Sequence, residues 1–109
     1  MGLSEERIAK NEAVAREINE QIEQTLESLP NGSFMHIVCE CGYEKCDRFI
    51  AVTMDEYERI RSDARQFCVV REHVIHDAEE IVLEVERFTV VAKREGTPAK
   101  VATRTDPRG

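Results

Sequence analysis

Three cysteines fall within one short stretch of the chain, residues 38–46, which reads VCECGYEKC. A thiolate is both a nucleophile and a soft metal ligand, so closely spaced cysteines suggest metal binding or redox chemistry. A metal ion needs its ligands within about 4 Å of one another, and short spacing along the chain brings sulfurs together. The C-x-C-x4-C spacing of Cys39, Cys41 and Cys46 therefore predicts a metal site. A strained, redox-active disulfide and unrelated buried thiols are the alternatives.

The cysteine stretch is predicted to form the tip of a β-hairpin. Residues 33–39, SFMHIVC, alternate in a way that suits a half-buried strand, and residues 47–52, DRFIAV, supply a second strand. Side chains repeat every two residues along a strand, so Cys39 and Cys41 should point to the same side. Gly42 should let the backbone reverse, and Cys46 would then face the first two thiols.

Three thiolates leave one position of a tetrahedral Zn²⁺ site to be filled from elsewhere. Cys68 lies in the apolar run FCVV, where a cysteine most often behaves as a small buried hydrophobe. His73 lies where this predicted strand gives way to a polar segment, which makes it the preferred fourth ligand. Cys68 comes second and His76 third, while His36 is interpreted as a residue at the surface or behind the ligands.

A long N-terminal helix is predicted over residues 4–29, with Ser4 as its N-cap and the sequence Pro-Asn-Gly at residues 30–32 as its end. The stripe of apolar residues is narrow and the rest of the helix is charged. Such a helix either lies over the domain or binds a partner. The apolar residues at helical spacing are Ile8, Val14, Ile18, Ile22, Leu26 and Leu29.

A second helix is predicted over residues 54–65, because Thr53 and Glu56 have the spacing of a capping box. Residues 66–70 and the segment FTVVAK are predicted strands. Residues 77–87 fit both a helix and a strand, and we favour a helical turn followed by a hairpin. The inner face of the second helix is predicted to carry Met54, Tyr57, Ile60 and Ala64.

The predicted fold class is α+β. It comprises an N-terminal helix at residues 1–30, a small antiparallel β domain with one internal helix at residues 31–94, and a disordered tail at residues 95–109. The chain has 109 residues with only 6% aromatic residues and 34% charged ones. A small, poorly apolar core benefits from a metal cross-link, which agrees with a zinc site inside the β domain.

The net charge of −7 disfavours nucleic acid as a partner, because an acidic surface repels phosphates. The sequence shows no signal peptide and no membrane-spanning run, so we expect a cytoplasmic protein. In that compartment, clustered cysteines are metal ligands or catalytic thiols more often than disulfides. A zinc-dependent nucleic-acid module is the runner-up function. It would rely on the basic tail and on arginines, of which Arg61 and Arg65 are expected to form a solvated face.

An enzymatic function is not expected. The chain lacks the common hydrolase, nucleotide-binding and deaminase motifs. Glu40 and Glu44, the carboxylates nearest the cysteines, are predicted to be solvated, and three thiolates would leave zinc too electron-rich to activate water. The leading hypothesis is a structural-zinc protein that binds another protein, or itself, through its N-terminal helix. A thiol-based redox switch is a further alternative.

Four patterns occur in a fixed order: F-x4-C-x-C-x4-C, T-x2-E-Y-x3-R, F-x-V-V-x2-H, and a strand ending in V-V-A-K. This order resembles small uncharacterised bacterial proteins of actinobacterial type, over about residues 11–94. In them an apolar residue usually stands at the position of Cys68 and a histidine at that of His73. The resemblance implies that the ligands are Cys39, Cys41, Cys46 and His73. Arg71 and Glu72 depart from the family, which tends to have Pro-Gly there, and no activity is implied.

Overall fold

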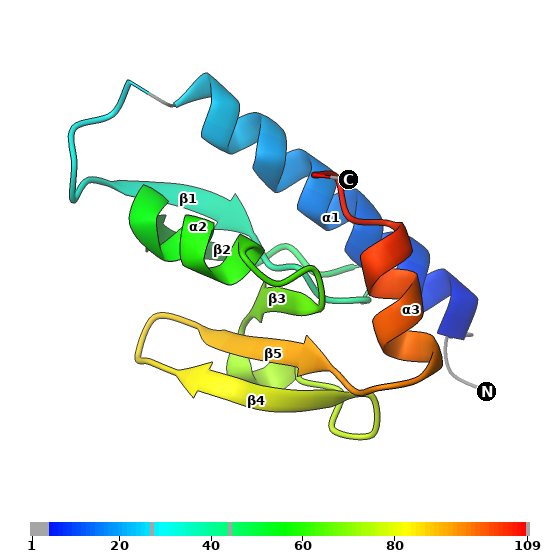
Figure 1. Ribbon diagram of the computed structural model, residues 1–109. Helices are drawn as coiled ribbons and strands as arrows, with labels where there is room; N and C mark the ends of the chain where they lie inside the picture. Colours follow the sequence, from blue (N-terminus) through cyan, green and yellow to red (C-terminus); the bar gives the residue numbers. More distant parts are fainter. Residues whose placement is uncertain (1–4, 27, 44, 109) are drawn as a thin grey trace.

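The computed structural model describes residues 5–26, 28–43 and 45–108, and it confirms the α+β class (Figure 1). Ser4, the predicted helix cap, lies outside the described residues, and so does Glu44. The elements in chain order are α1 (Glu5–Thr25), β1 (Phe34–Val38), β2 (Phe49–Thr53), α2 (Met54–Arg61), β3 (Gln66–Val69), the 3₁₀ helix η1 (Arg71–His73), β4 (Glu79–Glu84), β5 (Thr89–Lys93) and α3 (Thr97–Arg104).

Within the described residues the strands form two antiparallel sheets. Strands β1 and β2 are the predicted hairpin, with Phe34 opposite Thr53 and Val38 opposite Phe49. The second sheet has the order β3-β5-β4. Met35 and Ile37 are buried while Phe34 is exposed, so β1 is half-buried, as the alternation in the sequence predicted.

Helix α2 begins with the predicted capping box. The Glu56 N–H donates to Thr53 Oγ1 at 3.1 Å, and the Thr53 N–H donates to Glu56 Oε1 at 2.8 Å. The helix ends at Arg61 rather than at residue 65. Asp63 ends it early, because its carboxylate accepts the Arg65 backbone N–H at 2.9 Å and so stabilises a turn into β3.

The ambiguous segment at residues 77–87 is resolved as strand. A turn at residues 76–78 leads into β4, which pairs with β5 as a hairpin with an irregular register between Ile81 and Leu83. The favoured interpretation predicts a helical turn followed by a hairpin; the structure has the hairpin, preceded by a turn that is not part of a helix. Strand β4 lies at the edge of its sheet, and its apolar residues Ile81, Val82 and Leu83 are exposed. The helical spacing in this segment therefore does not correspond to the buried face of a helix.

The predicted disordered tail is wrong for the residues described, because residues 97–104 form helix α3 beside α1 (Figure 1). Gly96 turns the chain with φ of 102°, a conformation that favours glycine, and a proline in the first turn suits the start of the helix. Ala102 is buried, and its carbonyl accepts a hydrogen bond from Arg16 at 2.7 Å. The tail is thus held by partners distant in sequence, and its Ala102 joins the hydrophobic core.

Ion pairs extend this attachment beyond α3. The buried Arg61 pairs with Asp106, which corrects the expectation of a solvated arginine face at that position. Arg108 pairs with Glu20 of α1 and with Glu58 of α2. Arg108 of the tail therefore pairs with acidic side chains of the body instead of projecting away from it.

Helix α1 turns a polar face inward. Glu12, Arg16 and Asn19 are buried, although Val14 and Ile18 of the apolar stripe remain 47% and 43% exposed. Each inward side chain has specific partners. Arg16, for example, donates to the Ala64 carbonyl at 2.7 Å, and its guanidinium lies 4.2 Å from the centre of the Phe67 ring. Satisfied polar groups can be buried without a large penalty, so this polar face packs on the domain together with Ile22, Leu26 and Leu29 of the apolar stripe.

A buried ion triad joins α1 to the second sheet. Lys93 Nζ lies 2.6 Å from Glu12 Oε2 and 2.7 Å from Glu79 Oε2, and the three side chains are at most 5% exposed. Burial raises the pKa of Glu12 from 4.5 to about 7, although the charge of Lys93 opposes this rise. Glu12 therefore binds a proton more tightly in the folded chain than in the unfolded one.

The raised pKa of Glu12 predicts a pH-dependent stability. A group whose folded pKa exceeds its unfolded value stabilises the fold most at low pH, and this contribution falls as the pH rises from about 4.5 to about 7. Glu12→Gln should remove this decline. Between about pH 5 and about pH 8, its free energy of unfolding should therefore fall by about 1–3 kcal/mol less than that of the wild type. Urea denaturation at several pH values measures it, with the exposed Glu17→Gln as control. Parallel pH profiles for wild type and Glu12→Gln would contradict the prediction.

Candidate metal centre

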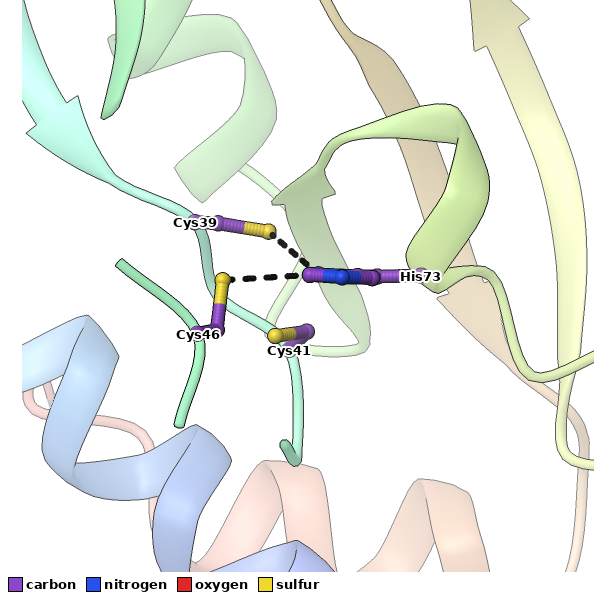
Figure 2. Close-up of side chains that lie close together, drawn as sticks. All are labelled: Cys39, Cys41, Cys46 and His73. Atoms are coloured by element: carbon purple, nitrogen blue, oxygen red, sulfur yellow. Dashed lines mark hydrogen bonds between the residues drawn. The ribbon is translucent and has the colours of Figure 1, made fainter. Parts of the chain in front are cut away.

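Cys39, Cys41, Cys46 and His73 converge in the structure (Figure 2). The three cysteines come from the β1–β2 loop and the histidine from η1, and their ligand atoms all lie within 4.8 Å of one another. His73 Nδ1 lies 3.7 Å from Cys39 Sγ and 3.4 Å from Cys46 Sγ. These four residues form a Cys₃His group that can hold a metal ion.

The distances fit tetrahedral coordination. Zinc bond lengths of about 2.3 Å to sulfur and about 2.0 Å to nitrogen place tetrahedral sulfur and nitrogen ligands about 3.5 Å apart. The two measured separations, 3.4 and 3.7 Å, bracket this value. The most widely separated ligand atoms, up to 4.8 Å apart, would have to approach by about 1 Å. Rotation of the side chains can supply a shift of that size without a change of fold.

Backbone hydrogen bonds shape the loop that carries the cysteines. The Cys39 N–H donates to the Arg48 carbonyl at 3.1 Å, which continues the hairpin past the ends of β1 and β2. The Cys46 N–H donates to the Tyr43 carbonyl at 3.2 Å and so closes the turn. On the opposite side, the His73 N–H donates to the Val70 carbonyl at 2.9 Å within η1. These backbone hydrogen bonds thus orient both the cysteine loop and η1, the two segments that carry the site.

Gly42 has a role that the sequence did not reveal. The structure gives it no positive φ; instead, a Cβ at this position would lie 2.3 Å from Ile8 Cγ2. Asn11 Nδ2 also donates to the Gly42 carbonyl at 2.9 Å. The glycine therefore permits α1 to lie directly on the cysteine loop.

One sulfur of the cluster accepts a backbone hydrogen bond. The Val70 N–H donates to Cys39 Sγ at 3.3 Å. A hydrogen bond from the Cys39 thiol lowers the pKa of Cys41 to about 5, while the same bond raises the pKa of Cys39 and burial raises the pKa of Cys46. A thiolate at neutral pH, the form that binds metal, is thus favoured at Cys41.

The other candidate ligands lie outside the group. Cys68 is fully buried in β3, and burial raises the pKa of its thiol, as expected for a small apolar core residue. His76 and His36 are exposed and do not belong to the cluster. The structure therefore brings together the four residues that sequence analysis preferred.

Glu40, which lies between two of the cysteines, contradicts the prediction of a solvated carboxylate. It is completely buried, and its carboxylate accepts hydrogen bonds from Asn19 Nδ2 at 2.8 Å, the Tyr57 hydroxyl at 3.0 Å and the Cys68 N–H at 2.9 Å. Burial raises the pKa of Glu40, and the hydrogen bonds oppose that rise. Nothing in the local sequence identifies these partners, because they lie on three other elements.

Tyr43 was also missed by the sequence analysis. Its ring lies 4.7 Å from the His73 ring with an interplanar angle of 42°, so the two rings touch at a tilt. The sequence feature that could have identified Tyr43 is its position inside the cysteine loop. The contact places Tyr43 beside the imidazole of the Cys₃His group.

Comparison of the chain with protein-family models, with curated proteins and with solved structures found no match. The resemblance to bacterial proteins of actinobacterial type therefore stays a prediction. In the part of the chain that the structure describes, no helix is long and apolar enough to cross a membrane.

Removal of the Glu40 carboxylate should destabilise the domain strongly. Glu40→Ala leaves three buried donors without an acceptor, which should lower the free energy of unfolding by about 3 kcal/mol or more. Glu40→Gln keeps one acceptor oxygen and should fall between the wild type and the alanine variant. Chemical denaturation measures this order, and a wild-type midpoint for Glu40→Ala would contradict it.

Proposed function

We propose that Cys39, Cys41, Cys46 and His73 hold a structural zinc ion. The observation that carries this proposal is the convergence of three sulfurs and one imidazole nitrogen within 4.8 Å. Thiolates with imidazole at tetrahedral spacing are the ligand set that zinc prefers in proteins. His73 would bind through Nδ1, the atom that faces the sulfurs.

The ligand set supports a structural role rather than a catalytic one. Four protein ligands fill a tetrahedral site, whereas a catalytic zinc keeps one position for water. Three thiolates with one Zn²⁺ carry a net charge of −1, and the Val70 N–H that donates to Cys39 Sγ partly offsets it. We therefore infer that the domain is not an enzyme at this centre.

Zinc would connect the two sheets. The cysteine loop joins β1 to β2, and η1 directly follows β3 of the other sheet. A metal bond across this junction would compensate for a small core in an acidic chain. Reduced thiolates also suit the cytoplasm, where we place the protein.

Metal content tests this proposal directly. Native mass spectrometry of the full chain should show about one zinc per molecule, lost on acidification because protons compete for the ligands. Chelation should lower the thermal midpoint. A metal-free protein in which Cys39, Cys41 and Cys46 are reactive would overturn the proposal, and a disulfide-linked mass that forms reversibly would favour the redox switch instead.

Substitutions identify the ligands. His73→Ala should weaken zinc binding by more than about 100-fold, since loss of outer-shell partners alone typically costs about 10–100-fold. His76→Ala, an exposed histidine three positions away, is the matched control and should bind as the wild type does. Cys46→Ser should also lose zinc, while Cys68→Ala should retain it. Equal binding by the two histidine variants would contradict the assignment of His73.

We further propose that the domain acts through protein contacts made by the outer face of α1. Val14 and Ile18, one helical turn apart, are exposed there as neighbouring apolar side chains. A nucleic-acid role has less support, because Arg61 and Arg65, two of the arginines it would need, pair with Asp106 and Asp63. Self-association is the form of this proposal that can be tested without a known partner.

Sedimentation tests self-association through α1. The zinc-loaded wild type should dimerise with rising concentration, and Ile18→Glu should shift it to monomer because it places a charge in an apolar contact. Ile81→Glu on β4 is a matched control, since both isoleucines are 43% exposed. A monomeric wild type at all concentrations, or equal effects of both substitutions, would contradict self-association through α1.

A further inference from the structure

A second candidate site lies away from the cysteines. A cavity of about 800 Å³ opens between α1, α3 and the second sheet. Its walls are mainly apolar, with Ile8 and Ala13 from α1, Phe67 from β3 and Val101 from α3 among them. Apolar cavities of about 300–1,000 Å³ with a few polar groups are the usual form of small-molecule sites.

Two charged residues of the buried triad line this cavity. Glu12 and Lys93 both face it, while Glu79 is not among the lining residues. Lys93 holds one oxygen of each carboxylate, Glu12 Oε2 and Glu79 Oε2, and Glu79 Oε1 accepts the Ile75 N–H at 2.8 Å. Glu12 is therefore the carboxylate that a molecule in the cavity would meet.

The triad lacks one positive charge. Two carboxylates and one ammonium sum to −1 when all are ionised, and they are nearly excluded from water. Buried charge is stable only when it is paired, so the site favours a proton or a second cation. The other charged lining groups, Lys10, Asp77 and Arg104, are exposed and act through solvent.

We propose that this cavity binds an apolar primary amine, with its ammonium group at Glu12 and its hydrocarbon tail against the apolar walls. Two carboxylates and two ammonium groups make a neutral buried cluster. A ligand carboxylate would add a third negative charge beside Glu12 and Glu79. An alcohol of the same length would gain the apolar contacts but no ion pair. The proposal is independent of the zinc centre.

Isothermal titration calorimetry of the zinc-loaded full chain tests the ligand class. Hexylammonium should bind at least about tenfold more tightly than hexanol, because a hydrogen bond to a charged group is added, and hexanoate should bind least. Tighter binding of hexanoate than of hexylammonium would show that the positive charges of Lys10 and Arg104 determine which ligand is preferred, and it would overturn the proposal. Absence of hexylammonium binding would overturn it as well.

Variants locate the site. Glu12→Gln should weaken hexylammonium binding at least about tenfold, whereas Glu17→Gln, exposed on the same helix, should leave it unchanged. Ala13→Phe should also reduce binding by filling the cavity, with circular dichroism as the check that it folds. Because it leaves the triad intact, Ala13→Phe tests the location even where Glu12→Gln fails to fold. Unchanged binding in Ala13→Phe would overturn the location.

Proton release gives a separate readout. Burial raises the pKa of Glu12 to about 7, against the opposing charge of Lys93 on β5 and with the added repulsion of Glu79 on β4. An ammonium ligand must displace this proton, so the affinity should rise by up to about tenfold from about pH 6 to about pH 8. Titrations in buffers of different ionisation enthalpy should show protons released at about pH 6. An affinity that falls over this range would contradict pairing with Glu12.

Discussion

The buried carboxylate of Glu40 is the interaction on which the rest of the structure depends. It lies between two cysteines of the metal centre and accepts hydrogen bonds from α1, α2 and β3. A carboxylate with no exposure to water is stable only when its oxygens are satisfied, so these donors must hold their positions. The backbone of the cysteine loop is thereby fixed before any metal is considered, which lowers the entropic cost of assembling the site.

The same principle governs helix α1. The chain is acidic and poor in aromatic residues, and α1 buries the polar side chains of Glu12, Arg16 and Asn19 on its inward face. Arg16 and Asn19 donate to backbone carbonyls, while Glu12 pairs with Lys93. Buried polar contacts add little net stability, but each one is costly to break. They specify one docking position for the helix and leave Val14 and Ile18 of its apolar stripe available at the surface.

The metal centre and the cavity share one structural support. Ile8 packs on Gly42 of the cysteine loop and also lines the cavity next to the buried triad. The position of α1 therefore affects both sites, although their chemistry differs. Soft thiolates at the first site suit zinc, and a net negative, water-poor cluster at the second suits an organic cation.

The sequence by itself determined the features that depend on neighbouring residues. These include the hairpin that carries Cys39, Cys41 and Cys46, the capping box of α2, and the preference for His73 over the apolar Cys68. Only the tertiary structure decided which polar groups are buried. The carboxylate of Glu40 accepts hydrogen bonds from three distant elements. The tail is held by a hydrogen bond from Arg16 and by the ion pairs Arg61–Asp106 and Arg108–Glu20. Composition at these positions predicts exposure, because charged groups are buried only where partners meet them. Those partners come together only once the chain has folded.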